Sequence, residues 1–246
     1  MGVLAGEMPV SFELEALKAQ AVASRTYVMK QIENNINNTY DVVDTVMNQV
    51  YLDKEHLMHV WNYSYTENIN KIKTAVLSTK GEYLSYDNKV VEALFFSTSP
   101  GITENSEEIF ISEEPYLRSV SSTWDEISPV YSTTITYTLS EFYNLLNLTY
   151  QEKLIIEVLE KTSTGRIKKI KINNKELTAN YICSKLSLNS TYFEIMQDGT
   201  KVIIKNKGYG HGVGMSQYGA EGMARSGYKY DEILKYYYKD VEIKKF

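Results

Sequence analysis

The sequence feature that most constrains the fold is an alternation of apolar and polar residues over positions 153–179, which read KLIIEVLEKTSTGRIKKIKINNKELTA. A period of two residues is typical of β-strands that bury one face. The alternation is interrupted by turn-forming residues at Ser163-Thr164-Gly165 and at Asn173-Asn174. Strands joined by such short turns predict a β-meander, so this part of the chain is expected to form a β-rich unit.

Helical signals lie on both sides of this β-rich stretch. After Pro9, Ser11 is a favourable N-cap for a long helix, whose buried stripe is expected to be Leu14, Leu17, Ala21 and Val28. Residues 55–62 predict a short helix, and a further helix is expected to end before Gly81. Near the C-terminus, a glycine-rich loop is followed by a helix to Arg225, a stop at Gly227 and a final helix.

This order of elements predicts an α+β fold with two lobes. Residues 1–125 and 194–246 are expected to form a larger helix-and-strand lobe that holds the active-site cleft. Residues 126–193 are expected to form a smaller β-rich lobe, in which Ser140 caps a helix. A chain of 246 residues is long enough to bury a core in each.

Composition excludes several classes of function. The net charge of −5 and the lack of a basic face argue against nucleic-acid binding. The lone Cys183 cannot form an internal disulfide or a multi-cysteine metal site. The most apolar run, residues 90–96, is far too short to span a membrane and is read as a strand. No signal peptide is recognisable, and a start inside an expected strand suggests that an anchor or export signal precedes this sequence.

A glycine-histidine loop is the most informative polar motif. Residues 208–219 read GYGHGVGMSQYG, which fits neither a phosphate-binding P-loop nor a dinucleotide-binding turn. Alternating glycines allow backbone to approach a ligand closely, although a tight structural turn would use them too. If a ligand binds here, His211, Ser216, Gln217 and Tyr218 can offer hydrogen bonds.

Other polar residues leave alternatives open. Lys18 and Arg25 are seven residues apart on the first long helix, where they either extend along its surface or point into a cleft. The loop STSPGITE brings Ser97, Ser99 and Glu104 after a strand, where they either decorate a turn or bind sugar hydroxyls.

Two further kinds of site have weak support. His56 and His59 could share a helical face as metal ligands, but they match no zinc-protease pattern. A triad of Ser97 or Ser99 with Asp125 and His211 lacks the nucleophile-elbow motif. We therefore expect neither a metal site nor a cofactor.

The sequence resembles the stage II sporulation protein D family and its amidase-enhancer relatives over nearly its whole length. The stretches that carry the resemblance are GVLAGEMPVSFELEALKAQAVASRTY, STSPGITENSEEIF, YLRSVSS, STGRIKKIKI, LSLNSTYFEI and GYGHGVGMSQYGAEGMARSGYKYDEILKYYY. The first and the last are the most specific.

That resemblance implies a lytic transglycosylase that cleaves the MurNAc–GlcNAc bond of peptide-stripped peptidoglycan and leaves 1,6-anhydroMurNAc ends. The family's catalytic glutamate matches Glu7, within AGEMP, and its helical lysine and arginine match Lys18 and Arg25. Its glycine-histidine loop matches His211 through Tyr218. A single acid suffices, because the sugar's own 6-hydroxyl replaces water as the nucleophile. Partial burial should keep Glu7 protonated until substrate binds.

Two rival readings remain. The chain could bind glycan and enhance a cell-wall amidase without cleaving, or it could be a two-carboxylate hydrolase with Glu104 as its second acid. Departures from the family pattern at Pro100, Phe110 and Cys183 bear on activity and substrate preference, and residues 39–51 lack the histidine and cysteines of a zinc site found in clostridial relatives.

The resemblance also implies a cellular setting. The partners would be an amidase that strips peptides from glycan and a membrane protein of the engulfment machinery. The location would be outside the cytoplasm, on the outer face of the mother-cell membrane of a sporulating bacterium.

Overall fold

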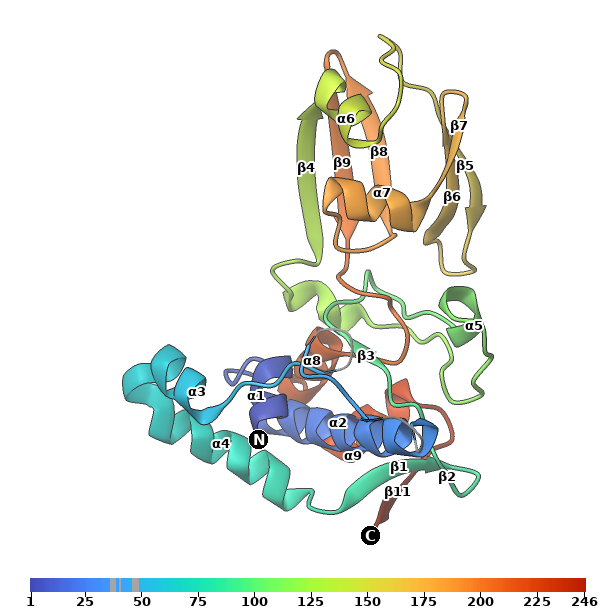
Figure 1. Ribbon diagram of the computed structural model, residues 1–246. Coiled ribbons are helices and arrows are strands. Elements are labelled where there is room, and N and C mark those ends of the chain that lie inside the picture. The colour runs from blue at the N-terminus through green and yellow to red at the C-terminus, as the bar shows by residue number, and fades with distance from the viewer. Residues whose placement is uncertain (36–38, 40, 46–48) are drawn as a thin grey trace.

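The computed structural model describes residues 1–35, 39, 41–45 and 49–246, and it confirms the α+β fold (Figure 1). The helices are α1 (Gly2–Glu7), α2 (Leu14–Asn34), α3 (Lys54–Trp61), α4 (Tyr65–Ser78), α5 (Ser106–Ile109), α6 (Leu139–Leu145), α7 (Ala179–Leu186), α8 (Gln217–Arg225) and α9 (Tyr230–Tyr237). Short 3-10 helices span Asn62–Ser64 and Thr123–Ile127.

In the described parts of the chain, the strands form four small sheets. They are β1 (Glu82–Tyr86), β2 (Lys89–Val90), β3 (Phe95–Phe96), β4 (Ser132–Thr138), β5 (Ile156–Lys161), β6 (Ile167–Ile172), β7 (Lys175–Thr178), β8 (Phe193–Asp198), β9 (Lys201–Lys207), β10 (Met215–Ser216) and β11 (Glu242–Lys245). Three sheets are antiparallel, with strand orders β11-β1-β2, β4-β9-β8 and β5-β6-β7. The fourth is the parallel pair β3 and β10.

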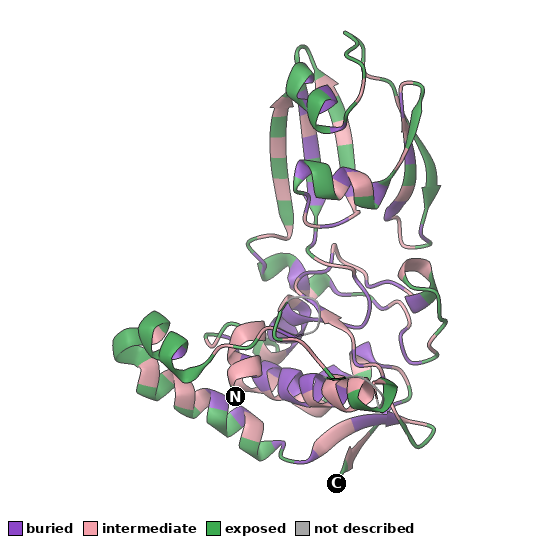
Figure 2. Cartoon of the chain, viewed as in Figure 1, coloured by how far each residue is buried: buried purple, intermediate pink, exposed green. Residues whose placement is uncertain are grey.

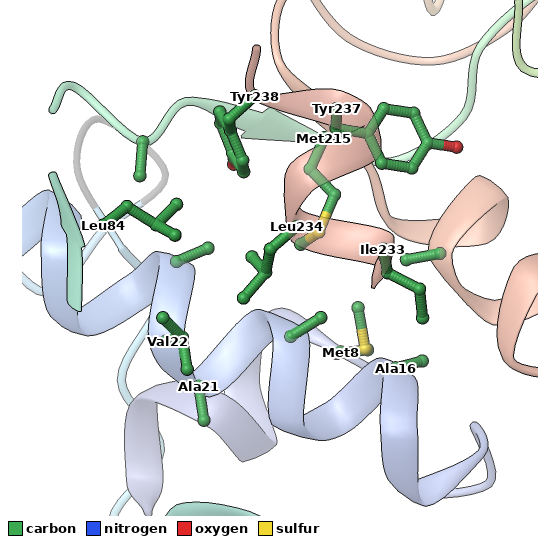
Figure 3. Close-up of a cluster of buried hydrophobic side chains, with 14 of the residues drawn as sticks. Met8, Ala16, Ala21, Val22, Leu84, Met215, Ile233, Leu234, Tyr237 and Tyr238 are labelled. Carbon is green, nitrogen blue, oxygen red and sulfur yellow. The ribbon is translucent and has the colours of Figure 1, made fainter. Parts of the chain in front are cut away.

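Helix α2 is the centre of the first hydrophobic cluster. It packs against α1, α4, α8, α9 and β1, so its middle is buried on several sides (Figure 2). Small residues make this possible, because Ala16, Ala19 and Ala23 let neighbouring elements approach closely. The predicted single stripe was therefore too narrow. Figure 3 shows Ala16, Ala21 and Val22 of α2 in the same buried cluster as Leu234 and Met215 from the C-terminal part.

The start of α2 differs from the prediction. The helix begins at Leu14, with Glu13 rather than Ser11 at the N-cap position. The backbone N–H of Glu13 donates a 2.6 Å hydrogen bond to the carboxylate of Glu221 on α8. A distant carboxylate thus replaces the local hydroxyl cap, at the helix end where negative charge is favourable.

A second hydrophobic cluster extends from Leu139 to Ile204. It lies between the β4-β9-β8 and β5-β6-β7 sheets, together with α6 and α7, in the upper part of Figure 1. Strand β9 pairs with β4, and β8 pairs with β9. Since β8 and β9 also contribute Phe193, Val202 and Ile204 to this cluster, we propose that the smaller lobe continues to Lys207 instead of ending at 193.

Several local predictions were confirmed and others were wrong. The β5-β6-β7 meander, the short helix α3 and the C-terminal helices α8 and α9 have the expected places. Gly2–Glu7 form a helix instead of the expected strand. The run at 90–96 is divided into β2 and β3, and Thr138 rather than Ser140 caps α6, through a capping box with Glu141. No helix among the described residues is long and apolar enough to cross a membrane.

Candidate active site

The pocket that contains Glu7 is the candidate active site. It has a volume of about 470 Å³ and lies between the N-terminal helices, β3 and the glycine-histidine loop. Its walls are mainly apolar and aromatic, with two carboxylates and one imidazole. The lining residues are Glu7, Tyr27, Val50, Glu92, Leu94, Phe95, Phe96, Ser97, Phe110, Tyr209, Gly210 and His211.

Two glycines of α1 explain how Glu7 is held. Gly2 and Gly6 lie one helical turn apart, and a Cβ atom at either position would come within 2.4 or 2.8 Å of the carbonyl oxygens of Leu52 and Val50, respectively. The chain at 50–52 can therefore lie directly against the helix. In this position the backbone N–H of Val50 donates to Oε1 of Glu7. The glycine before Glu7 thus brings in the hydrogen-bond donor that orients the carboxyl group.

The environment of Glu7 suits an acid. Burial raises its pKa above the ordinary value for glutamate, and the hydrogen bond from Val50 partly opposes this effect. The backbone oxygen of Glu7 accepts a 2.9 Å hydrogen bond from the side-chain amide of Gln217, at the start of α8. Gln217 therefore supports the end of α1 through its backbone and does not line the pocket.

The parallel pair β3 and β10 brings the other side of the pocket into place. Phe95 pairs with Met215, and Phe96 pairs with Ser216. A separate antiparallel bridge between Thr98 and Tyr209 joins the loop after β3 to the loop before β10. Ser97 and His211 consequently lie in the same pocket as Glu7. The structure therefore brings together three of the residues predicted for the site, from the N-terminal, middle and C-terminal parts of the chain.

His211 is held as a neutral imidazole. Its Nδ1 accepts a hydrogen bond from the backbone N–H of Val213, so its Nε2 carries the proton and donates to the backbone oxygen of Phe95, 3.1 Å away. Burial, with the nearby positive charge of Arg166, lowers the pKa of His211 to about 4. The ring also packs between Phe96 and Phe110, with centroids 5.6 Å from each.

The serines near the pocket mostly serve the structure. The backbone N–H of Ser99 and the hydroxyl of Ser216 both donate to Oδ1 of buried Asp125. Burial raises the pKa of Asp125 to about 6. Because His211 bonds to backbone groups while Asp125 bonds to Ser99 and Ser216, these residues do not form a nucleophilic triad.

Lys18 and Arg25 do not line the Glu7 pocket. Lys18 forms a 2.7 Å ion pair with Glu15 on its own helix. Arg25 donates a 2.6 Å hydrogen bond to the backbone oxygen of Glu82 and lines a different hollow beside α4. We therefore leave Lys18 and Arg25 out of the substrate contacts proposed below.

Glu104 and Tyr218 also lie outside the pocket lining. Glu104 is fully buried and pairs with Arg166, whose Nε lies 3.3 Å from its Oε1. Tyr218 packs edge-on against Phe12, with ring centroids 5.0 Å apart. Glu104 is therefore poorly placed as a second catalytic acid.

Glu92 and Phe110 line the pocket, although the sequence motifs did not identify either as a site residue. Glu92 interrupts the apolar run VVEALFF, and a charged residue there was the available signal that the strand is broken. Burial raises the pKa of its carboxyl group, and Gln31 donates a 3.3 Å hydrogen bond to its Oε1. Phe110, one of the departures from the family pattern, contributes a half-exposed aromatic wall beside His211.

The remaining predicted or unusual positions lie elsewhere. His56 and His59 are exposed on α3, and among the described residues no three His, Cys, Asp or Glu side chains gather as metal ligands would. Part of the stretch 39–51 lies outside the described residues. Cys183 is on α7 in the smaller lobe, where its thiol donates to the backbone oxygen of Ser190.

The fold and the pocket define a class of α+β protein in which a partly buried acid at the end of a short N-terminal helix shares a pocket with a histidine loop from the C-terminal part. The chain belongs to the stage II sporulation protein D family. The family described as "SpoIID: Stage II sporulation protein" matches residues 1–86.

Similar proteins cover far more of the chain. It is 43% identical over 248 residues to Stage II sporulation protein D of Bacillus subtilis (strain 168), a match of 99% of this chain and 72% of the relative. It is also 32% identical over 295 residues to Amidase enhancer of the same organism, a match of 96% of this chain and 39% of that protein. The resemblance stated from the motifs is thus confirmed.

Proposed function

We propose that the chain is a lytic transglycosylase that cleaves the MurNAc–GlcNAc bond of peptide-stripped peptidoglycan during engulfment in spore formation. The observation that carries the proposal is the position of Glu7. It is a partly buried acid, held at Oε1 by Val50, in a pocket with apolar and aromatic walls. Apolar surroundings favour the protonated carboxyl group, which is the form a general acid needs.

The proposed reaction uses Glu7 twice. The protonated carboxyl group gives its proton to the glycosidic oxygen as the bond from that oxygen to C1 of MurNAc breaks. The 6-hydroxyl of the same MurNAc then attacks C1, and its proton returns to the Glu7 carboxylate. A 1,6-anhydro ring forms, no water is consumed and Glu7 ends protonated again. Since Val50 occupies Oε1, the proton is carried on Oε2.

Other pocket groups fit a sugar substrate. Phe110 and Tyr209 present exposed aromatic surface, which pyranose rings pack against, and Ser97 offers a hydroxyl group. No lysine or arginine is found among the described lining residues, so positive charge that develops on the sugar ring meets no nearby cation in the pocket wall. A carboxylate at Glu92 would stabilise the same charge.

Mass spectrometry of the products of peptide-free glycan strands tests the proposal. Transglycosylation gives ends lighter than hydrolysed ends by one water molecule. We expect anhydro ends with the native chain and none with Glu7→Gln, while the exposed Glu176→Gln variant serves as a control. Retained cleavage by Glu7→Gln would refute the site assignment. Hydrated ends that disappear in Glu92→Gln would instead indicate a two-carboxylate hydrolase.

A glycan-binding enhancer of an amidase is the alternative, favoured by the similarity to a protein named Amidase enhancer. This alternative predicts that the protein binds glycan strands without changing their ends. It also predicts that adding the protein accelerates an amidase. Either function places the chain outside the cytoplasm, and we propose the outer face of the mother-cell membrane. The proposed partners are a peptide-stripping amidase and a membrane protein of the engulfment machinery.

A further inference from the structure

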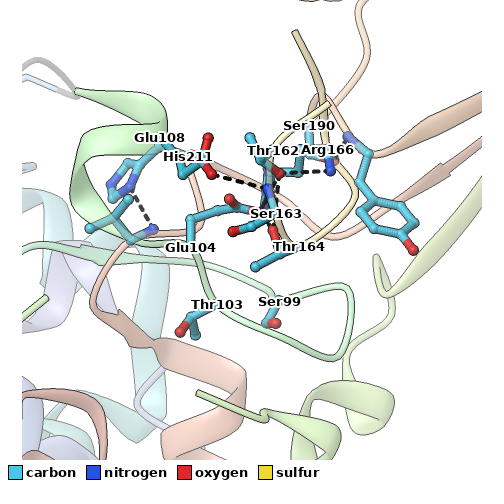
Figure 4. Close-up of polar contacts among 12 residues, drawn as sticks. Ser99, Thr103, Glu104, Glu108, Thr162, Ser163, Thr164, Arg166, Ser190 and His211 are labelled. Atoms are coloured by element: carbon cyan, nitrogen blue, oxygen red, sulfur yellow. Dashed lines mark hydrogen bonds and ion pairs between the residues drawn. The ribbon is translucent and has the colours of Figure 1, made fainter. Parts of the chain in front are cut away.

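Arg166 is a buried cation that the proposed reaction does not use. It precedes β6 in the smaller lobe, and only 1% of its side chain is exposed. Its Nη1 donates a 2.9 Å hydrogen bond to the backbone oxygen of Gly210, directly before His211. Figure 4 shows the polar group formed by Glu104, Thr162, Thr164 and Arg166, with His211 beside it.

The residue after His211 also lies against this group. A Cβ atom at Gly212 would come within 2.6 Å of Nη2 of Arg166, so the backbone lies directly on the guanidinium. The backbone oxygen of Gly212 accepts a 2.8 Å hydrogen bond from the N–H of Glu104. The loop is thus fixed on both sides of His211, at Gly210 by Arg166 and at Gly212 by Glu104.

Stability alone is a poor explanation for this arrangement. Removing both charges from water costs several kcal/mol per ion, which a buried pair recovers only with good hydrogen bonding. Here Nε and Nη2 of Arg166 and Oε2 of Glu104 find no hydrogen-bond partner among the described residues. An apolar pair of similar size would stabilise the fold about as well. The retained charges therefore point to a role in the shape and electrostatics of the loop.

We propose that Arg166 is a positioning residue for the active site, which reaches from the smaller lobe to hold the His211 loop against the Glu7 pocket. The smaller lobe then acts on catalysis without touching substrate, because displacement of Gly210 also moves Tyr209 and His211 in the pocket wall. The catalytic part of this inference rests on the proposed function, whereas the structural part does not.

The variants Arg166→Lys and Arg166→Met separate shape from charge. Lysine keeps the charge but cannot hold Gly210 and approach Glu104 together, and methionine removes both. Lys168→Met is the matched control. Lys168 lies two residues further along the chain, and its Nζ forms a 2.7 Å ion pair with Glu108. Like the pair of Arg166 and Glu104, this ion pair joins the segment around 166–168 to the segment around 104–108, but it is partly exposed. This control removes a cation between the same segments but leaves the His211 loop untouched.

Two measurements decide the matter. The first is the pKa of His211 by NMR, with its signal identified from a His211→Gln variant. We expect the pKa to rise from about 4 towards the ordinary value in Arg166→Met and to change little in Arg166→Lys or Lys168→Met. The second is glycan cleavage. Here kcat should fall by roughly tenfold to a hundredfold in both Arg166 variants, with KM nearly unchanged, because a displacement of about 1 Å in a site can cost this much.

The outcomes are distinguishable. Arg166→Met that folds with an unchanged His211 pKa and unchanged kcat would overturn the inference, as would equal losses in Lys168→Met. If Arg166→Met fails to fold, Arg166→Lys decides: a lower kcat with a low His211 pKa supports positioning, and native kcat refutes it. A native chain that cleaves no glycan overturns the proposed function alone, because the His211 titration still tests the contact.

Discussion

Protonation of His211 should destabilise the fold, and the size of the effect follows from its surroundings. Burial and Arg166 lower the pKa of His211 from 6.5 to about 4. The folded state therefore binds a proton less readily than the unfolded chain. His211 contributes full stability above pH 6.5, and this contribution is lost as the pH falls through 4. The shift corresponds to about 3 kcal/mol between pH 7 and pH 4.

Asp125 opposes this trend in the native chain. Burial raises its pKa from 3.8 to about 6, so its contribution is fully present below pH 3.8 and lost as the pH rises through 6. Acidification from pH 7 to pH 4 therefore gains roughly 2 kcal/mol from Asp125. The contributions of His211 and Asp125 to the free energy of unfolding nearly cancel. The pH dependence of the native chain's stability would therefore not reveal either one by itself.

A difference between two proteins isolates His211. Urea unfolding of the native chain and of His211→Gln, followed by tryptophan fluorescence at several pH values, gives both curves. Every other group titrates in both proteins. The free energy of unfolding of the variant minus that of the native chain should therefore increase by about 3 kcal/mol as the pH falls from 7 to 4. His56→Gln, at an exposed position, is the control. Parallel curves for the native chain and His211→Gln would refute the buried neutral imidazole.

Two further predictions concern helix ends. Gly6→Ala should lower glycan cleavage by roughly tenfold, because the added Cβ would displace Val50 and weaken its hydrogen bond to Glu7. The control Ala5→Gly destabilises the same helix without adding an atom, so it should retain more activity. Equal activities would contradict this account. Glu221→Ala should lower the free energy of unfolding by about 1–3 kcal/mol in urea titrations, because the N–H of Glu13 loses its acceptor, whereas Arg225→Ala should cost less than about 1 kcal/mol. An unchanged free energy of unfolding in Glu221→Ala would show that the cap at Glu13 is unimportant.

Local signals predicted the parts of the fold that depend on neighbouring residues. The β5-β6-β7 meander follows from alternation and from turns at Gly165 and Asn173, where φ is positive. Long-range pairing was harder to predict. Strands β8 and β9 follow the meander in sequence and pair with each other, but β9 joins β4, which precedes the meander, and no local pattern records that choice. The expected boundary at 193 therefore left nearly all of β8 and all of β9 in the larger lobe.

The candidate site was predictable where a motif carried it and unpredictable where packing decided. Glu7 and His211 came from motifs, and the structure places them in one pocket. Lys18 and Arg25 share a helical face as expected, but α2 is surrounded on so many sides that a shared face does not mean a shared cleft. Glu92 enters the pocket because the apolar run breaks between β2, which pairs with the neighbouring β1, and β3, which pairs with the distant β10.

The glycines of the histidine loop connect these observations. Their alternation suggested close approach to a ligand, but a Cβ at Gly214 would meet the backbone oxygen of Leu94 at 2.1 Å, and one at Gly212 would meet Arg166. What approaches so closely is the protein itself. Tyr209 lies between Gly208 and Gly210, and His211 lies between Gly210 and Gly212. Because the glycines pack against the protein, these two side chains are left to line the pocket. A loop built in this way transmits any movement of the smaller lobe to the pocket wall, because no side chain separates its backbone from Arg166.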